Sequence, residues 1–139
     1  MLGWADRSSS PAADMSKRRL SIRFRLPPYQ YPRNEWRKAI HEAAIRRLRR
    51  TRYLDGDKLE IDVMLYLKSS HLAMSDLDNR LKDVLDALQG RAGGPKGRRT
   101  LAPIIANDSQ IWRATVEKSA APRQNPRGGG WVSLRGFRT

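Results

Sequence analysis

Two segments of the chain alternate between apolar and polar residues, and a helical pattern separates them. In residues 18–26 the apolar side chains fall on one face and arginine and serine on the other, and residues 59–68 alternate in the same way. Alternation with a period of two predicts strands with one buried face. Between them, residues 34 to about 51 have apolar residues at helical spacing, with Asn34 in the position of an N-cap.

The second half of the chain repeats this order. Leucine and valine fall in a narrow sector of a helix in the segment "SDLDNRLKDVLDAL", residues 75–88, and Gly90 follows as a terminator. A further strand is predicted at residues 111–118. Strand, helix, strand, helix, strand predicts a small α/β domain with helices packed on a sheet, although this order alone does not distinguish a parallel from a mixed sheet. At 139 residues the chain has room for one ordinary domain.

The ends of the chain differ from the middle in composition. Both are polar and rich in Gly and Pro or Ser, which predicts a flexible leader at residues 1–16, a folded domain at 17–119 and a basic flexible tail at 120–139. No segment is an apolar run long enough to span a bilayer, and none resembles a secretory signal. We therefore expect a soluble cytoplasmic protein without a membrane partner.

Charge and cysteine content narrow the class of function. Lys and Arg number 28 against 14 Asp and Glu, which gives a formal net charge of +14 and favours nucleic acid as the partner. The absence of cysteine excludes disulfides and thiolate metal sites. Cations on the polar face of the first strand and at the end of the first helix are the candidate contacts to DNA phosphates. They are Arg19, Arg23, Arg25, Arg46, Arg49 and Arg50.

Acidic residues gather at residues 76–86 of this basic chain. The structural interpretation is that Ser75 or Asp76 caps the helix and that acids in the first turn suit its dipole. The functional interpretation is that Asp76 and Asp78 bind Mg²⁺, which accepts one or two carboxylates together with water and phosphate oxygens. Lys82, one turn further on, would then stabilise negative charge on a phosphate. Asp108 is either a turn residue or a third ligand that the fold brings beside the helix start.

These motifs resemble the RusA family of Holliday-junction resolvases. The family pattern Asp-x-Asp-Asn, a lysine four residues after the second Asp, an Asp-Ala-Leu segment and a later Asp-Asp-x-Gln correspond to stretches of this sequence. The matching stretches are Asp76-Leu77-Asp78-Asn79, Lys82, Asp86-Ala87-Leu88 and Asn107-Asp108-Ser109-Gln110. Asn107 stands where the family has its first Asp.

The resemblance, which spans about residues 18–119, implies both a fold and an activity. It implies a mixed sheet with two main helices packed on it, and a homodimeric endonuclease that uses Mg²⁺ to nick opposed strands of a four-way DNA junction. Asp76, Asp78 and Asp108 would be metal ligands and catalytic residues, and Lys82 a catalytic cation.

Two other functions remain open from the sequence. One is a non-catalytic basic protein that binds DNA or RNA and uses the aspartates only as helix caps. The other is a nuclease of similar metal chemistry that acts on structured RNA. Cleavage of a synthetic four-way junction in the presence of Mg²⁺ distinguishes the first of these from the endonuclease, and structured RNA offered beside it distinguishes the second.

Overall fold

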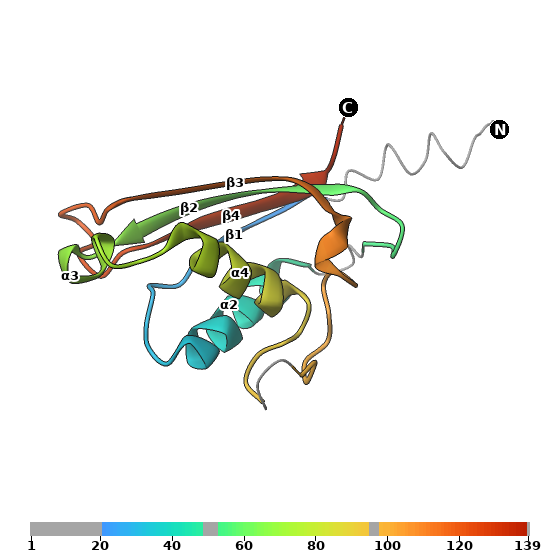
Figure 1. Cartoon of the computed structure of the whole chain (residues 1–139), viewed down its shortest axis with the longest axis horizontal. Helices are drawn as coiled ribbons and strands as arrows, with labels where there is room; N and C mark the ends of the chain where they lie inside the picture. The colour runs from blue at the N-terminus through green and yellow to red at the C-terminus, as the bar shows by residue number, and fades with distance from the viewer. Residues whose placement is uncertain (1–20, 49–52, 95–97, 139) are drawn as a thin grey trace.

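One four-stranded sheet forms the frame of the protein, and both long helices pack against the same face of it (Figure 1). The structure is a computed structural model that describes residues 21–48, 53–94 and 98–138. The elements in chain order are β1 (Ile22–Arg25), α2 (Arg33–Leu48), β2 (Leu59–Leu67), α3 (Ser69–Leu72), α4 (Leu77–Leu88), the 3₁₀ turn η1 (Asp108–Gln110), β3 (Ile111–Ala120) and β4 (Gly129–Gly136). The predicted fold class, a small α/β domain with two main helices on a mixed sheet, is confirmed.

The strands lie in the order β1-β4-β2-β3, which makes β1 and β3 the two edges of the sheet. β2 and β3 run parallel, because α4 and the loop after it carry the chain back to the starting end of the sheet. β4 runs antiparallel to both of its neighbours and lies between β1 and β2. The sheet is therefore mixed, and β1 and β2 point in the same direction.

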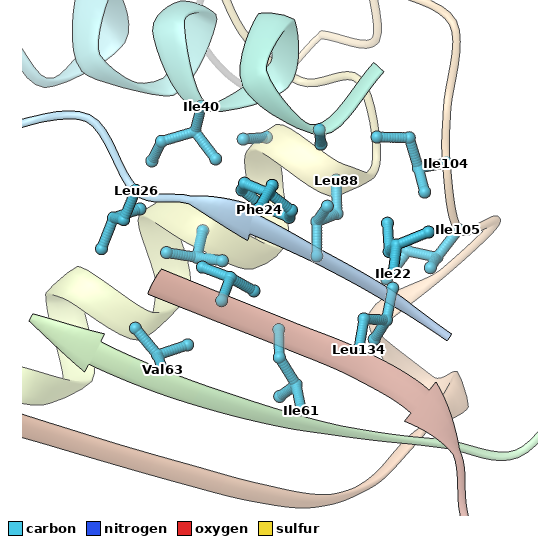
Figure 2. Packing of buried hydrophobic residues seen from close by; sticks show 14 of the residues in the cluster. Ile22, Phe24, Leu26, Ile40, Ile61, Val63, Leu88, Ile104, Ile105 and Leu134 are labelled. Carbon is cyan, nitrogen blue, oxygen red and sulfur yellow. The ribbon is translucent and has the colours of Figure 1, made fainter. Parts of the chain in front are cut away.

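The core lies between the sheet and the two helices (Figure 2). Alternate residues of the strands point toward the helices, as the sequence pattern predicts, and the helices supply apolar side chains from above. The labelled residues in Figure 2 include Phe24, Ile61 and Leu134 from strands and Ile40 and Leu88 from helices, and each of them is buried. The apolar residues that recur at the helical period and those that recur at the strand period thus pack into one shared core.

The element boundaries follow the sequence with small differences. β2 ends one residue before the predicted segment, and β3 extends two residues beyond its predicted end. α2 begins at Arg33, so Asn34 is not its N-cap, which corrects that prediction. The Asn34 side chain instead accepts a hydrogen bond from the Gly93 backbone N–H at 3.1 Å and donates one to the Gly94 carbonyl at 3.2 Å. The predicted leader at residues 1–16 and the predicted end of the first helix beyond residue 48 lie outside the described residues.

The predicted flexible tail at residues 120–139 is wrong, because this segment contains β4. Val132 and Leu134 are fully buried, and the strand pairs with β2 along its whole length and with β1 over Trp131 to Leu134. Three consecutive glycines precede these residues, and Gly128, Gly129 and Gly130 all have positive φ. The glycine content that predicted a flexible tail instead permits the entry into a central strand, so the folded domain extends past residue 119.

Replacing Gly130 with alanine is expected to destabilise the protein. The residue has a φ of 134°, which side chains rarely adopt, and an added Cβ would collide with the Met64 carbonyl oxygen of β2. We expect a loss of about 1–3 kcal/mol in the free energy of unfolding, measured by urea denaturation. Gly136→Ala in the same strand is the matched control, since nothing lies within 4 Å of its Cβ position. An equal loss in both variants would contradict the argument.

Candidate functional site

A cavity of about 840 Å³ opens beside β1 and the end of α2, and we call it the arginine groove. Its charged lining consists of Arg23 and Arg25 from β1 and Arg46 and Arg47 from α2. The remaining lining residues come mainly from the loop after β1, from β2 and from the start of β4. They include Leu26, Pro27, Pro28, Tyr66, Gly128, Gly129, Gly130 and Trp131. Among the residues that the structure describes, no aspartate or glutamate lines this groove.

Two contacts made by arginine side chains hold the elements around the groove together. The Arg23 guanidinium lies 4.4 Å from the centroid of the Trp131 ring, which stacks a cation on an aromatic face. Arg47 Nε donates a hydrogen bond to the Arg23 carbonyl oxygen at 3.1 Å and so ties α2 to β1. Positive charge beside a half-buried aromatic ring is an arrangement suited to a nucleic-acid backbone and a base.

The groove brings together three of the predicted phosphate contacts. Arg23 and Arg25 project from the strand face that the alternation assigned to solvent, and Arg46 joins them from α2. Arg47 belongs to the same group, and its position beside Arg46 in a basic helix end was the signal for it. Predicted contacts Arg19, Arg49 and Arg50 lie outside the described residues.

Asp76 and Asp78 lie at the start of α4, and both are exposed. Asp76 is the N-cap, as the structural interpretation predicts. Its Oδ1 accepts a hydrogen bond from the Asp78 backbone N–H at 3.1 Å, and its Oδ2 accepts one from Asn79 Nδ2 at 3.3 Å. No salt bridge joins Asp76 or Asp78 to another residue in the described part of the chain. Asp78 therefore presents a carboxylate to solvent from the first helical turn.

The start of α4 is fixed above the final third of β3 by a lysine. Lys118 of β3 donates hydrogen bonds from Nζ to the carbonyl oxygens of Leu72 at 2.7 Å and Ser75 at 2.9 Å. These bonds close the turn between α3 and α4 immediately before Asp76. The lysine side chain thus holds the aspartates at the end of the sheet where β2 and β3 finish.

Along α4, a buried carboxylate anchors the helix to α2. Asp83 is fully buried, and its oxygens lie 2.9 Å from Arg33 Nη2, 2.9 Å from Arg37 Nε and 3.2 Å from Arg80 Nε. The hydrogen bond to Asp83 raises the pKa of the Arg33 guanidinium. The interaction with Arg80 Nε lacks the geometry of a hydrogen bond and is an ionic contact.

The two remaining polar residues of α4 that the sequence motif includes, Lys82 and Asp86, differ in their surroundings. Lys82 is exposed one turn after Asp78, as predicted, and is free to approach a ligand. Asp86 is half-buried and lies 3.6 Å from Arg37 Nη2, so it belongs with the structural pairs of α2 and α4.

Asp108 lies at the opposite end of α4 from Asp76 and Asp78. The Leu88 carbonyl, at the end of the helix, accepts hydrogen bonds from the backbone N–H groups of Ile104 at 2.7 Å and Ile105 at 3.1 Å, and Asp108 follows closely. A helix of 12 residues is about 18 Å long, so this length separates the two positions. Among the described residues, no three His, Cys, Asp or Glu side chains gather closely enough to share a metal ion. The expectation that the fold brings Asp108 beside Asp76 and Asp78 at the start of the helix is not met.

The motif around Asp108 has a structural role that spacing did not reveal. Asn107 accepts a hydrogen bond from the Ser109 backbone N–H at 2.8 Å, and the buried Gln110 side chain accepts bonds from the N–H groups of Ala106 and Asn107. Gln110 Nε2 also donates to the carbonyl oxygens of Leu54 and Asp57, at 2.9 and 3.0 Å. The motif therefore caps η1 and locks the start of β3 to the turn before β2.

Comparison with known proteins adds no family to this picture. No model of a known protein family matches the sequence, and no match to a curated protein is found either. The resemblance to junction resolvases therefore rests on the motif residues themselves. Within the part of the chain that the structure describes, no helix combines the length and apolar character that crossing a bilayer requires.

Proposed function

We propose that this protein is a Mg²⁺-dependent endonuclease that binds branched DNA, and that its substrate is the four-way junction. The observation that carries the proposal is the exposed carboxylate pair at the start of α4, in a protein whose arginine groove reaches the end of β2 at Tyr66. The loop after β1 links the two. Pro27 and Pro28 line the groove, and the neighbouring Tyr29 ring packs edge-on against His71 of α3, with centroids 5.3 Å apart.

In this proposal the groove holds the DNA backbone and the aspartates act on it. The four arginines of the groove would neutralise phosphates and position the strand without reading its sequence. A purely adhesive surface gains nothing from unpaired acids beside its DNA contacts, because they repel phosphates. The pair Asp76 and Asp78 is therefore better explained as a site that receives a cation.

The carboxylates of Asp76 and Asp78 are a ligand pair that suits Mg²⁺, because they leave coordination positions open to water and substrate. Mg²⁺ is bound through one or two carboxylates and completes its shell with water and substrate phosphate oxygens. The Asp78 carboxylate makes no hydrogen bond or ion pair with the described residues, whereas Asp76 also serves as the cap, so Asp78 would be the principal ligand. When bound, the ion would lower the pKa of a water molecule and polarise the phosphate. Lys82 would stabilise the negative charge that develops on the phosphate.

The second candidate function is a non-catalytic basic protein that binds DNA or RNA. One observation favours it: both Asp76 oxygens accept hydrogen bonds from the first helical turn, which is a complete explanation of that residue as a cap. The position of Asp108 at the far end of α4 also removes a third ligand from the site in a single chain.

A junction-cleavage assay separates these candidates. The protein is mixed with a labelled four-way DNA junction, a linear duplex and a structured RNA, each with Mg²⁺ and with EDTA. We expect nicks in the junction alone, and only with Mg²⁺. Tight binding of the junction without cleavage in Mg²⁺ would overturn the endonuclease and favour the binding protein. Cleavage of RNA in preference to the junction would redirect the proposal to a ribonuclease.

Neutralising two groove arginines is expected to weaken DNA binding and reduce its salt dependence. For Arg25→Gln combined with Arg46→Gln, the slope of log affinity against log salt concentration should become shallower by about 0.9 for each duplex phosphate that the variant no longer neutralises. Fluorescence anisotropy of a labelled junction at several salt concentrations measures this slope. Arg98→Gln combined with Arg138→Gln, two exposed arginines outside the groove, is the control that removes the same number of charges. A similar slope change in that variant would show that net charge, and not the groove, governs binding.

A further inference from the structure

The arginine groove has an apolar part beside its cations. Leu26, Pro27, Pro28 and Trp131 line it, and three consecutive glycines add backbone without side chains. Binding a DNA duplex from outside needs only cations and polar groups, because the phosphates lie on its surface and the bases stay stacked inside. A cavity of about 840 Å³ with apolar walls has the size and character of a site that encloses a ligand. The lining therefore indicates a ligand with an apolar part as well as negative charge.

Trp131 offers the groove's largest flat surface to such a ligand. It lies in β4 directly opposite Arg25 of β1, and the Arg23 guanidinium is 4.4 Å from its ring centroid. The ring is half-buried, and among the described residues no second ring or cation stacks on it. Nucleobases stack on aromatic rings and on guanidinium planes alike. Trp131 and Arg23 together thus form a stacking platform for a base.

The arginines around this platform come from two elements. Arg23 and Arg25 are exposed on the same face of β1, two residues apart, which separates their Cα atoms by about 6.6 Å. Arg46 and Arg47 add cations from α2. Cations from two elements can hold the phosphates before and after one base while that base turns inward. A paired base cannot turn into the groove without leaving its stack, so this arrangement suits an unpaired strand.

The edge of β1 adds hydrogen-bonding groups to the same groove. β1 is an edge strand, and the Leu26 N–H donates to the Gly130 carbonyl of β4, so the backbone of Arg25 points the other way. The Arg23 carbonyl shares this outward direction and accepts the bond from Arg47. Among the described residues, the Arg25 N–H and C=O have no hydrogen-bond partner. They are available to the edge of a base, which carries donors and acceptors.

We propose that the arginine groove binds an unpaired stretch of DNA, with one base stacked on the platform of Trp131 and Arg23 and the neighbouring phosphates held by the other groove arginines. The stacking follows from the groove residues themselves. The choice of DNA over RNA rests on the proposed function, because the strands of a four-way junction leave their duplexes at the branch point. The groove would therefore favour a branch point over a continuous duplex.

Two single strands with the same phosphates test whether the groove holds a base. One is a labelled oligonucleotide of about eight thymidines, within the site sizes of folds that bind single strands. The other is a strand of the same length made of abasic units, and fluorescence anisotropy measures both affinities at one salt concentration. We expect the unaltered protein to bind the thymidine strand about 5- to 150-fold more tightly, the contribution of stacking one base. Equal affinities would overturn the proposal.

Removing the ring tests whether Trp131 is the stacking residue. In Trp131→Ala the two strands should bind within about twofold of each other, whereas Trp131→Phe keeps a flat ring and should retain most of the difference. Trp112→Ala is the matched control, because Trp112 is 57% exposed and lies outside the groove. A difference that survives in Trp131→Ala, or that is lost equally in Trp112→Ala, would overturn the assignment.

Tryptophan fluorescence keeps the proposal testable if Trp131→Ala does not fold. A base stacked on the ring should quench its emission, so the thymidine strand should quench the unaltered protein and the abasic strand should not. The quenching should be lost in Trp131→Phe and retained in Trp112→Phe, two changes that each preserve an aromatic ring. Quenching of the same size in Trp131→Phe would overturn the site.

The result is separable from that of the junction-cleavage assay. Binding that depends on the base and on Trp131, in a protein that cuts no junction, would support the stacking site and overturn the endonuclease. Cleavage of the junction together with equal affinity for the two strands would do the reverse. A uridine strand of the same length tests the choice of DNA, and tighter binding of that strand than of the thymidine strand would overturn it.

Discussion

Replacing Asp83 with asparagine is expected to lower the free energy of unfolding by about 3–5 kcal/mol, the cost of removing one partner from a buried ion pair. The Asp83 side chain is fully buried and contacts Arg33, Arg37 and Arg80. Arg80 is itself buried, with its guanidinium 4.4 Å from the Tyr29 ring centroid. Asparagine keeps the size of the side chain and removes the charge, so buried arginines would be left uncompensated. Urea denaturation followed by the fluorescence of the tryptophans measures the loss.

Asp86→Asn is the matched control for this prediction. It lies three residues, about one helical turn, after Asp83 and also contacts α2, but it is half-buried and 3.6 Å from Arg37 Nη2. A partly solvated pair of this length contributes less than about 1 kcal/mol. If the two variants lose equal stability, burial of the Asp83 carboxylate is not the reason for its effect.

The ion pairs of Asp83 also hold the helix that carries the aspartates against the helix that lines the arginine groove. Arg33 and Arg37 belong to α2, whose far end supplies Arg46 and Arg47 to the arginine groove. Asp83 belongs to α4, whose start carries Asp76 and Asp78. The buried pairs therefore connect the element that would bind DNA to the element that would act on it.

Sequence periodicity predicted the elements whose apolar residues are numerous. β1, β2 and α4 each repeat their apolar residues often enough to determine a period, and the structure confirms them. β4 has two fully buried apolar residues, Val132 and Leu134, preceded by three glycines. Its stability comes from pairing with β1 and β2 on both sides, which are contacts far apart in sequence that local patterns do not contain.

The candidate site was likewise predictable where residues are close in sequence and not where they are distant. Residues within one helical turn are neighbours by geometry, so the common position of Asp76 and Asp78 and the exposed position of Lys82 could be predicted. The arginines of β1 and α2 were predicted as DNA contacts from two separate elements, and the structure places three of them in one groove. Asp108 follows 30 residues after Asp78, and its position depends on how far the chain returns along the sheet. Spacing does not determine that distance.

Replacing Asp78 with asparagine is expected to reduce Mg²⁺-dependent junction cleavage by about 100-fold or more, the scale of losing one group that stabilises charge in a transition state. Asp78 is exposed, and the N-cap bond runs from its backbone N–H to Asp76, so the helix start is kept. Removing a negative charge beside the DNA path should leave junction affinity unchanged or raise it. Single-turnover cleavage and anisotropy on the same protein preparation measure the two quantities separately.

Asp86→Asn again provides the control, because it removes one carboxylate from the same helix at a position tied to α2. The cleavage rate of this variant should be within about threefold of that of the unaltered protein. Asp86 is half-buried and eight residues along α4 from Asp78, and a partly solvated charge there contributes little to the stability of a bound phosphate. Cleavage that survives Asp78→Asn would overturn the metal site, because no other group at the start of α4 presents a carboxylate with both oxygens unbonded. Loss of binding together with cleavage would instead indicate a damaged fold, which the urea denaturation of the same variant detects. Loss of cleavage with binding intact is the one result that assigns Asp78 to the chemistry.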